Sequence, residues 1–339
     1  MTTLAPTKSV SFKHLNALYL CLPLCFLIVL VDQLLLNQQL QKALPHSPQG
    51  LFLFALFFGL PHIIASNIIL FSNRDYLQHF KKQLVSISLI IIGFILLCQL
   101  VFSYTWAYFL FAAMTILHVL KQQFGLTRAV TRLGGKTFQL WTWSGISAGI
   151  AIYTGVFMFK LLSQEQLYLL TLMACCICVF FILQGSLLYR QTQPGIGRAY
   201  LVSNTLLIPV SLALYIMGYS FLTILCPRII HDCSAFLIYL NHDQNRRNST
   251  MKNRLYGYAD SFKLPTFIVL ISIAVLIAYL LRWQGQHLST ISLELISPET
   301  ALGIALLLKT FLELMHYYME SITWKADSPY RKHVRFQAK

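Results

Sequence analysis

The chain has 339 residues, of which 57% are hydrophobic and only 11% are charged, with a formal net charge of +15. A soluble domain is nearer a quarter charged, so this composition excludes a soluble globular protein. No polar stretch is long enough to fold by itself, and residues 1–339 are predicted to form a single all-α domain embedded in a membrane. The eight cysteines lie mostly in apolar runs, which indicates small buried residues and no disulfide framework.

Apolar runs of about 20 residues recur along the chain, each long enough to cross a bilayer core of roughly 30 Å. They predict a polytopic bundle of about ten transmembrane helices. The first run follows Lys8 and Lys13 but is too long for a signal peptide, so it is expected to be a retained span. The ten expected spans are residues 17–36, 51–71, 84–101, 104–120, 139–159, 166–188, 200–221, 226–241, 264–281 and 300–320.

Basic residues orient these spans. With ten spans and a cytoplasmic N-terminus, most of the 26 Lys and Arg fall in cytoplasmic segments, such as residues 121–136 and 242–263. This bias follows the positive-inside rule and places both termini in the cytoplasm. Topology and attraction to anionic lipids explain the positive charge, so no nucleic-acid partner is expected. The expected location is a bacterial inner membrane.

Histidines mark four of the spans, and ionisable residues inside a membrane are functional candidates by default. At a rise of 1.5 Å per residue, three of them should lie at a similar depth in the inner half of the membrane. These three are His62, His231 and His316. His118 and His242 are expected in a second layer near the cytoplasmic boundary.

The last span contains the most specific pattern, K-T-F-L-E-L-M-H-Y-Y-M-E at residues 309–320. Its helical spacing puts Glu313, His316 and Glu320 on one face in successive turns. An E-x-x-H pair that points into a helical bundle is how carboxylate-bridged di-iron sites take two ligands from one helix. Lys309, one turn before Glu313, is expected to neutralise that carboxylate.

The span at 226–241, together with the two residues that follow it, carries two His-Asp pairs that are eleven residues apart. His231 and His242 share a helix face but lie roughly 16 Å apart, so they cannot bind one ion together. Tyr239 follows on a similar face and is expected to supply a hydroxyl group. In the span at 51–71, Pro61 is expected to bend the helix at His62.

Several of these segments resemble a family of histidine-rich, multi-pass bacterial membrane proteins of unsettled function, which is similar to the Brp/Blh carotene-cleaving dioxygenases. The motifs are G-L-P-H at 59–62, L-H-V-L-K-Q-Q-F-G at 117–125, the two His-Asp pairs, and H-Y-Y-M-E-S-I-T-W-K at 316–325. The dioxygenases carry G-x-P-H-G and H-F-G, whereas here Ile63 replaces the final glycine of the first motif. The resemblance implies an iron(II) site made of imidazoles.

These patterns predict a membrane-embedded metalloenzyme, a non-haem iron oxygenase, hydroxylase or desaturase with one or two iron ions. It would take a lipid-like acyl or isoprenoid substrate from the bilayer and electrons from a cytoplasmic donor. The expected metal ligands are His62, His118, His231, His242, His316 and Glu313. The residues expected to orient imidazoles or relay protons are Asp232, Asp243, Gln122, Glu320 and Tyr239.

Other interpretations stay open at this point. A lone histidine in a membrane helix is often only an interhelical hydrogen-bonding residue. The same His, Asp and Glu residues would suit a proton- or metal-coupled transporter, although no internal repeat is evident. A membrane acyltransferase would need one buried histidine as its base. Histidine-ligated haem is a further alternative.

Overall fold

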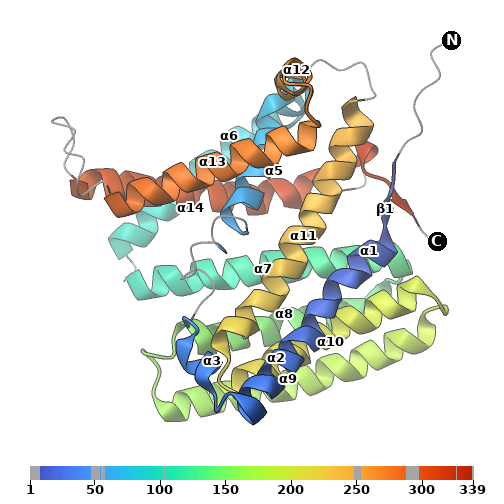
Figure 1. Ribbon diagram of the computed structural model, residues 1–339, viewed down its shortest axis with the longest axis vertical. Coiled ribbons are helices and arrows are strands. Elements are labelled where there is room, and N and C mark those ends of the chain that lie inside the picture. The colour runs from blue at the N-terminus through green and yellow to red at the C-terminus, as the bar shows by residue number, and fades with distance from the viewer. Residues whose placement is uncertain are drawn as a thin grey trace. The chain divides into compact units, whose positions relative to one another are not determined.

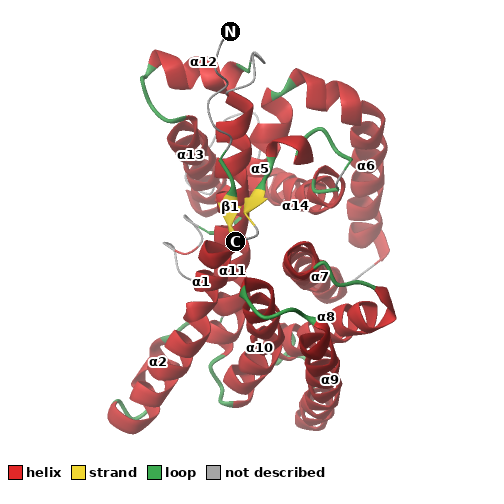
Figure 2. Ribbon diagram, turned by 90° about the vertical axis from the view of Figure 1, so that its right-hand side faces the viewer, coloured by secondary structure: helices red, strands yellow, loops and turns green. Residues whose placement is uncertain are grey.

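The computed structural model describes residues 8–46, 54, 58–101, 104–247, 253–287, 298–325 and 327–337, and these are mostly helical, which confirms the all-α prediction. Figure 1 shows the helices in chain order, and Figure 2 marks the two short paired strands in yellow. The elements are β1 (Val10–Ser11), α1 (Phe12–Ala17), the 3-10 helix η1 (Leu18–Leu20), α2 (Cys21–Leu35), α3 (Gln39–Ala43), α5 (Leu60–Ser72), α6 (Arg74–Val101), α7 (Tyr104–Thr131), α8 (Gly135–Phe157), α9 (Gln164–Gln191), α10 (Ile196–Ile216), α11 (Ser220–Arg247), α12 (Arg254–Ser261), α13 (Thr266–His287), α14 (Pro298–Thr323), the 3-10 helix η3 (Arg331–His333) and β2 (Phe336–Gln337).

The chain divides into two compact units. Unit 1 comprises Met1–Val10, Leu53–Tyr104 and Ala235–Arg335, and unit 2 comprises Ser11–Phe52, Thr105–Ser234 and Phe336–Lys339. Helix α11 belongs to both, because its first half lies in unit 2 and its second half in unit 1. The single membrane domain expected from the sequence stays a prediction.

Several helices are long and apolar enough to cross a membrane, as expected, but their number is lower than ten. Within the described part of the chain there are six such helices, or seven if the bent pair α12–α13 forms one span. The six are Phe12–Leu35, Arg74–Cys98, Phe109–Thr131, Gln164–Gln191, Ile196–Ile216 and Ser220–Arg247. The orientation inferred from ten spans therefore stays a prediction.

The differences from the expected spans have local causes. In the described part of the run at 51–71, the apolar helix is the 13-residue α5, roughly 20 Å long and too short for a bilayer core. The span expected at 264–281 starts at a 108° bend between α12 and α13. Helix α8 covers the span expected at 139–159 but is not among the six, and it is rich in glycine, serine and threonine.

In unit 2, α8 packs closely against its neighbours through two glycines. A Cβ atom on Gly145 would lie 2.6 Å from Cε2 of Phe181 and 2.8 Å from Cζ of Phe124. A Cβ atom on Gly149 would lie 2.6 Å from Cδ1 of Leu120. Small residues let membrane helices approach in this way. The contact places α7, and with it His118, against α8.

We expect Gly145→Ala to lower the free energy of unfolding in detergent by about 1–3 kcal/mol, because packed aromatic rings occupy the space of the added methyl group. The matched control is Gly93→Ala on α6, where an added Cβ meets nothing within 4 Å. That change should be neutral or stabilising by up to about 1 kcal/mol, because alanine is the better helix former. Equal stabilities of the two variants would contradict this packing.

In unit 1, α5 packs against α6, α13 and α14. A buried arginine, Arg246, joins the end of α11 to the start of α6. Its Nε donates to Oδ1 of Asn73 at 2.7 Å, and its Nη1 donates to the Tyr76 hydroxyl at 2.9 Å. Its Nη2 pairs with Oδ1 of Asp75 at 2.6 Å. Three acceptors of unit 1 are thereby satisfied by one side chain.

The segment after α14 packs on the second half of α11. The ring of Tyr330 stacks on that of His242, with centroids 4.1 Å apart and planes 7° from parallel. Asn245 donates to the carbonyl oxygen of His333 at 2.9 Å, and Asn241 accepts from the backbone N–H of Arg335 at 2.9 Å. These contacts position Tyr330 beside α11 within unit 1.

Candidate metal centre

His62 lies in the first turn of α5. Gly59, just before the helix, has a φ of 74°, which favours glycine, and Pro61 occupies one of the first two helical positions. The expectation that Pro61 bends a helix at His62 was therefore wrong: a proline in the first turn starts a helix, because no backbone hydrogen bond is lost there. The side chain of His62 is only 1% exposed.

Helix α14 brings an imidazole and a carboxylate to the same place from one face. His316 and Glu320 are one turn apart, and Nε2 of His316 lies 3.6 Å from Oε2 of Glu320. The Nδ1 atom of His316 lies 2.6 Å from the hydroxyl of Ser66 on α5. Both α14 side chains are at most 3% exposed. The other ring nitrogen of His316 is thus fixed by a hydroxyl group, as is usual for metal-binding histidines.

The part of α11 in unit 1 adds Tyr239. Its hydroxyl donates to Oε1 of Glu320, and its ring stacks on His62 with centroids 5.5 Å apart and planes 11° from parallel. His62 also lies edge-on to His316, with centroids 4.6 Å apart. Tyr239 therefore positions both a carboxylate and an imidazole of this group.

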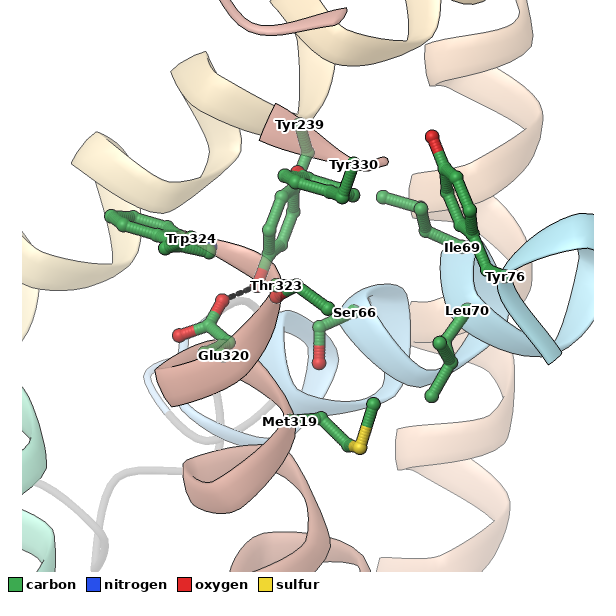
Figure 3. A pocket seen from close by; sticks show the side chains of 10 residues that line it. All are labelled: Ser66, Ile69, Leu70, Tyr76, Tyr239, Met319, Glu320, Thr323, Trp324 and Tyr330. Carbon is green, nitrogen blue, oxygen red and sulfur yellow. Dashed lines mark hydrogen bonds between the residues drawn. The ribbon is translucent and has the colours of Figure 1, made fainter. Parts of the chain in front are cut away.

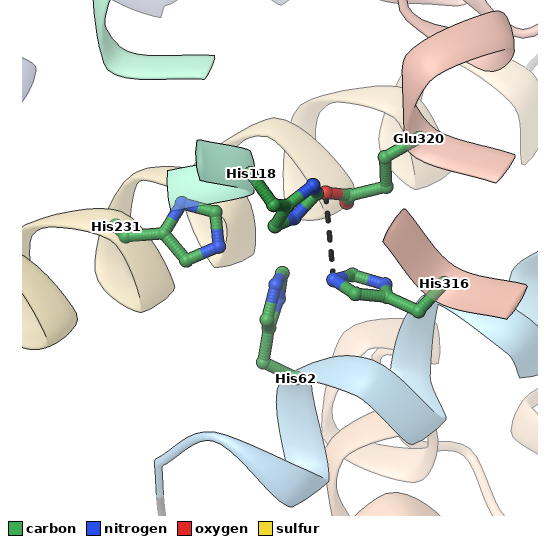
Figure 4. Close-up of side chains that lie close together, drawn as sticks. All are labelled: His62, His118, His231, His316 and Glu320. Carbon is green, nitrogen blue, oxygen red and sulfur yellow. Dashed lines mark ion pairs between the residues drawn. The ribbon is translucent and has the colours of Figure 1, made fainter. Parts of the chain in front are cut away.

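His62, His316 and Glu320, hereafter the unit 1 triad, each offer a ligand atom within 4.8 Å of the other two (Figure 4). Two imidazoles and a carboxylate at this separation can hold a metal ion, and no charged side chain of the triad reaches water. Buried ionisable groups are costly unless they are paired or bind a metal. The structure thus contains a buried His/Glu cluster with the composition of a metal site.

Unit 2 contains a second pair of imidazoles, from α7 and the first half of α11. The rings of His118 and His231 lie edge to face with centroids 5.2 Å apart, and each offers a ligand atom within 4.8 Å of the other (Figure 4). Both are buried. The sequence placed them in different layers, which was wrong. Helix α7 continues to Thr131, so His118 lies in mid-helix instead of at its end.

Other residues expected in the site are placed elsewhere within unit 1. Glu313 pairs with Lys309, with Oε1 and Nζ 3.7 Å apart, as the sequence predicted. The Nε2 atom of His242 is hydrogen-bonded to the Tyr76 hydroxyl at 2.7 Å. Asp243 is buried within hydrogen-bonding distance of Tyr256. The roles assigned to Glu313, His242 and Asp243 stay predictions.

In unit 2, Asp232 follows His231 and is buried, and Gln122 is half-buried one turn after His118. Their positions on α11 and α7 are those expected from the sequence, and their roles stay predictions.

Sequence reasoning missed Ser66, which fixes the ring of His316. A signal was present, because Ser66 follows His62 by one helical turn in P-H-I-I-A-S and so lies on the same face. It also missed Tyr330, which reaches unit 1 from beyond the last helix and has no neighbouring motif that would have revealed it.

A pocket in unit 1 adjoins the triad and is lined by Glu320 of the triad and by Tyr239, which donates to Glu320 (Figure 3). It is narrow and partly open to the surroundings. Burial raises the pKa of the Tyr330 hydroxyl well above its usual range, so the pocket is lined there by a neutral phenol. Its apolar wall consists of Ile69, Leu70, Met319 and Trp324.

Comparison of the chain with protein-family models, with curated proteins and with solved structures finds no match.

We expect Tyr239→Phe to weaken metal binding roughly 10- to 100-fold, the usual effect of losing a group that orients a ligand. The ring that stacks on His62 is kept, and only the hydroxyl that donates to Glu320 is lost. The metal dissociation constant, measured by competition with a chelator, checks this. Tyr258→Phe, at an exposed position on α12, is the control and should leave the constant unchanged. Equal constants for Tyr239→Phe and Tyr258→Phe would contradict the role.

Proposed function

We propose that this protein is a membrane-embedded non-haem iron enzyme, an oxygenase, hydroxylase or desaturase that acts on a lipid-like substrate. The observation that carries the proposal is the unit 1 triad, in which two buried imidazoles and one buried carboxylate come within 4.8 Å of one another. Two histidines and one carboxylate with open positions are the ligand set of many iron(II) oxygenases.

Two imidazoles and one carboxylate suit both iron(II) and catalytic zinc, so the choice of iron rests on the sequence resemblance. Cysteine sulfur is absent from the triad, which argues against a structural zinc site, and a set of oxygen ligands alone would be needed for calcium or magnesium. The sequence resemblance to membrane dioxygenases favours iron. When bound, iron(II) would supply the chemistry that activates dioxygen.

The protein residues around the triad have separable roles in this proposal. Ser66 and Tyr239 hold His316 and Glu320 in place and limit their rotation. Burial of the triad excludes water, which would otherwise compete for the metal and quench reactive species.

A lipid-like substrate is supported by the pocket beside Glu320. Its apolar wall suits contact with an acyl or isoprenoid chain. The reacting carbon would lie near Glu320, Tyr239 and Ser66, the three residues common to the pocket and the site. An apolar chain could enter from the bilayer without crossing water.

The remaining partners follow from charge and location. The basic segments at 121–136 and 242–263 suit an acidic cytoplasmic electron donor and anionic lipids of a bacterial inner membrane. Desaturation or hydroxylation by iron requires external electrons, which such a donor would provide.

The imidazoles of His118 and His231 are proposed as further metal ligands, as the sequence predicts. Their sharing of an ion with the triad stays a prediction, and the metal content of His231→Ala tests it. A single shared site predicts loss of all iron in His231→Ala, whereas a separate second ion predicts loss of only part.

The reaction class is tested with purified protein in lipid vesicles, supplied with iron(II), a reductant and isotopically labelled dioxygen. We expect mass spectrometry to find vesicle lipid that has gained one labelled oxygen atom or lost two hydrogen atoms. The His62→Ala variant serves as the control and should give no product. Product at wild-type rates from His62→Ala, or from metal-free protein, would overturn the proposal. A Soret absorption band would replace it with haem.

A further inference from the structure

Three of the eight cysteines, Cys21, Cys25 and Cys226, lie close together in unit 2. Cys21 and Cys25 are one turn apart on α2, and Cys226 and Cys233 are two turns apart on α11. The Sγ atoms of Cys25 and Cys226 are 3.2 Å apart, and Cys21 also lies within hydrogen-bonding reach of Cys226. All four are free thiols. Helix packing by itself does not require the sulfur atoms of these cysteines to lie in contact.

These thiols differ in how deeply they are buried. Cys25 and Cys226 are buried, whereas Cys21 is half-buried and more accessible to a reagent. Closing the 3.2 Å separation of Cys25 and Cys226 to a disulfide bond of about 2.04 Å needs a movement of about 1 Å. The three thiols thus combine an accessible position with a buried pair that is close to bonding distance.

We propose that Cys21, Cys25 and Cys226 form a thiol–disulfide exchange site in unit 2, with small apolar disulfides as its oxidant class. The proposal is independent of the metal centre. An apolar oxidant is required because α2 and α11 are both among the helices apolar enough to lie in a membrane.

The exchange proceeds in three balanced steps. The Cys21 sulfur attacks the small disulfide, forms a mixed disulfide and releases the first small thiol, which takes the proton lost by Cys21. Cys226 then attacks the Cys21 sulfur and releases the second small thiol. Finally Cys25 attacks Cys226 and returns Cys21 to the thiol form. Two protein thiols are oxidised to one disulfide, and one small disulfide is reduced to two thiols.

The test uses full-length protein in detergent with dithiodipyridine, an apolar aromatic disulfide whose released thione absorbs light. Remaining thiols are alkylated, and disulfide-linked peptides are mapped by mass spectrometry. We expect wild-type protein to release two thiones per disulfide formed and to yield a Cys25–Cys226 linkage. Mixed disulfides confined to single cysteines, with no Cys25–Cys226 linkage, would overturn the proposal, and this readout needs no variant.

Variants then test the order of the steps. Cys21→Ser should slow the Cys25–Cys226 linkage roughly tenfold or more, because the accessible thiol is lost. Cys25→Ser should instead accumulate a Cys21–Cys226 linkage. The control is Cys176→Ser, an exposed position on α9, which should keep the wild-type rate of linkage. A wild-type rate in Cys21→Ser would overturn the assigned entry point.

Discussion

Replacement of His316 by alanine is expected to weaken iron binding more than about 100-fold and to abolish activity. His316 is the residue of the triad with most contacts to the others: it lies edge-on to His62 and 3.6 Å from Glu320. Loss of a mere orienting group already weakens metal binding roughly 10- to 100-fold, so the loss of a ligand should exceed that range. Metal content after gel filtration, with chelator competition for affinity, measures the effect.

The control for this change is His79→Ala. His79 is exposed on α6 in the same unit and has no place in the triad. It should keep full metal content, and both variants should keep the helical circular dichroism of the wild type. His316→Ala with unchanged iron content would contradict the assignment of this histidine as a ligand.

Replacement of Arg246 by methionine should lower the free energy of unfolding by about 3 kcal/mol. Arg246 is 1% exposed and donates to Asn73, Tyr76 and Asp75. Removing one partner of a buried ion pair typically costs about 3–5 kcal/mol, and the partial exposure of Asp75 places the effect at the lower end. Chemical denaturation in detergent, followed by circular dichroism, gives the value.

The neighbouring arginine provides the control. Arg247 pairs with Asp260, but both side chains are more than a third exposed. Exposed ion pairs contribute about 0–1 kcal/mol, so Arg247→Met should change stability by no more than that. Equal losses in the two variants would show that the network around Arg246 does not hold α11 to α6.

Much of the fold could be predicted from the sequence, because hydrophobic runs report helices directly. Six expected spans coincide with apolar helices of sufficient length, from Phe12–Leu35 to Ser220–Arg247. Hydropathy does not reveal where a run is broken. The left-handed turn at Gly59 and the 108° bend before α13 depend on local backbone conformation, so α5 and α13 were expected as plain spans.

The residue types of the site could be predicted from the sequence, but which of these residues lie next to one another could not. Helical spacing placed Glu320 on the face of His316, and the structure pairs them. The choice between Glu313 and Glu320 as the neighbour of His316 depends on how α14 is rotated against α5, which one sequence does not reveal. The depth of His118 was misjudged, since helix length beyond the apolar run, here to Thr131, shifts every depth estimate.

The most direct test of the central claim is the iron content of wild-type protein purified in mild detergent without added chelator. We expect roughly one iron ion or more per chain, removed by chelation together with activity and restored by iron(II). Protein that is free of metal and yet fully active would contradict it.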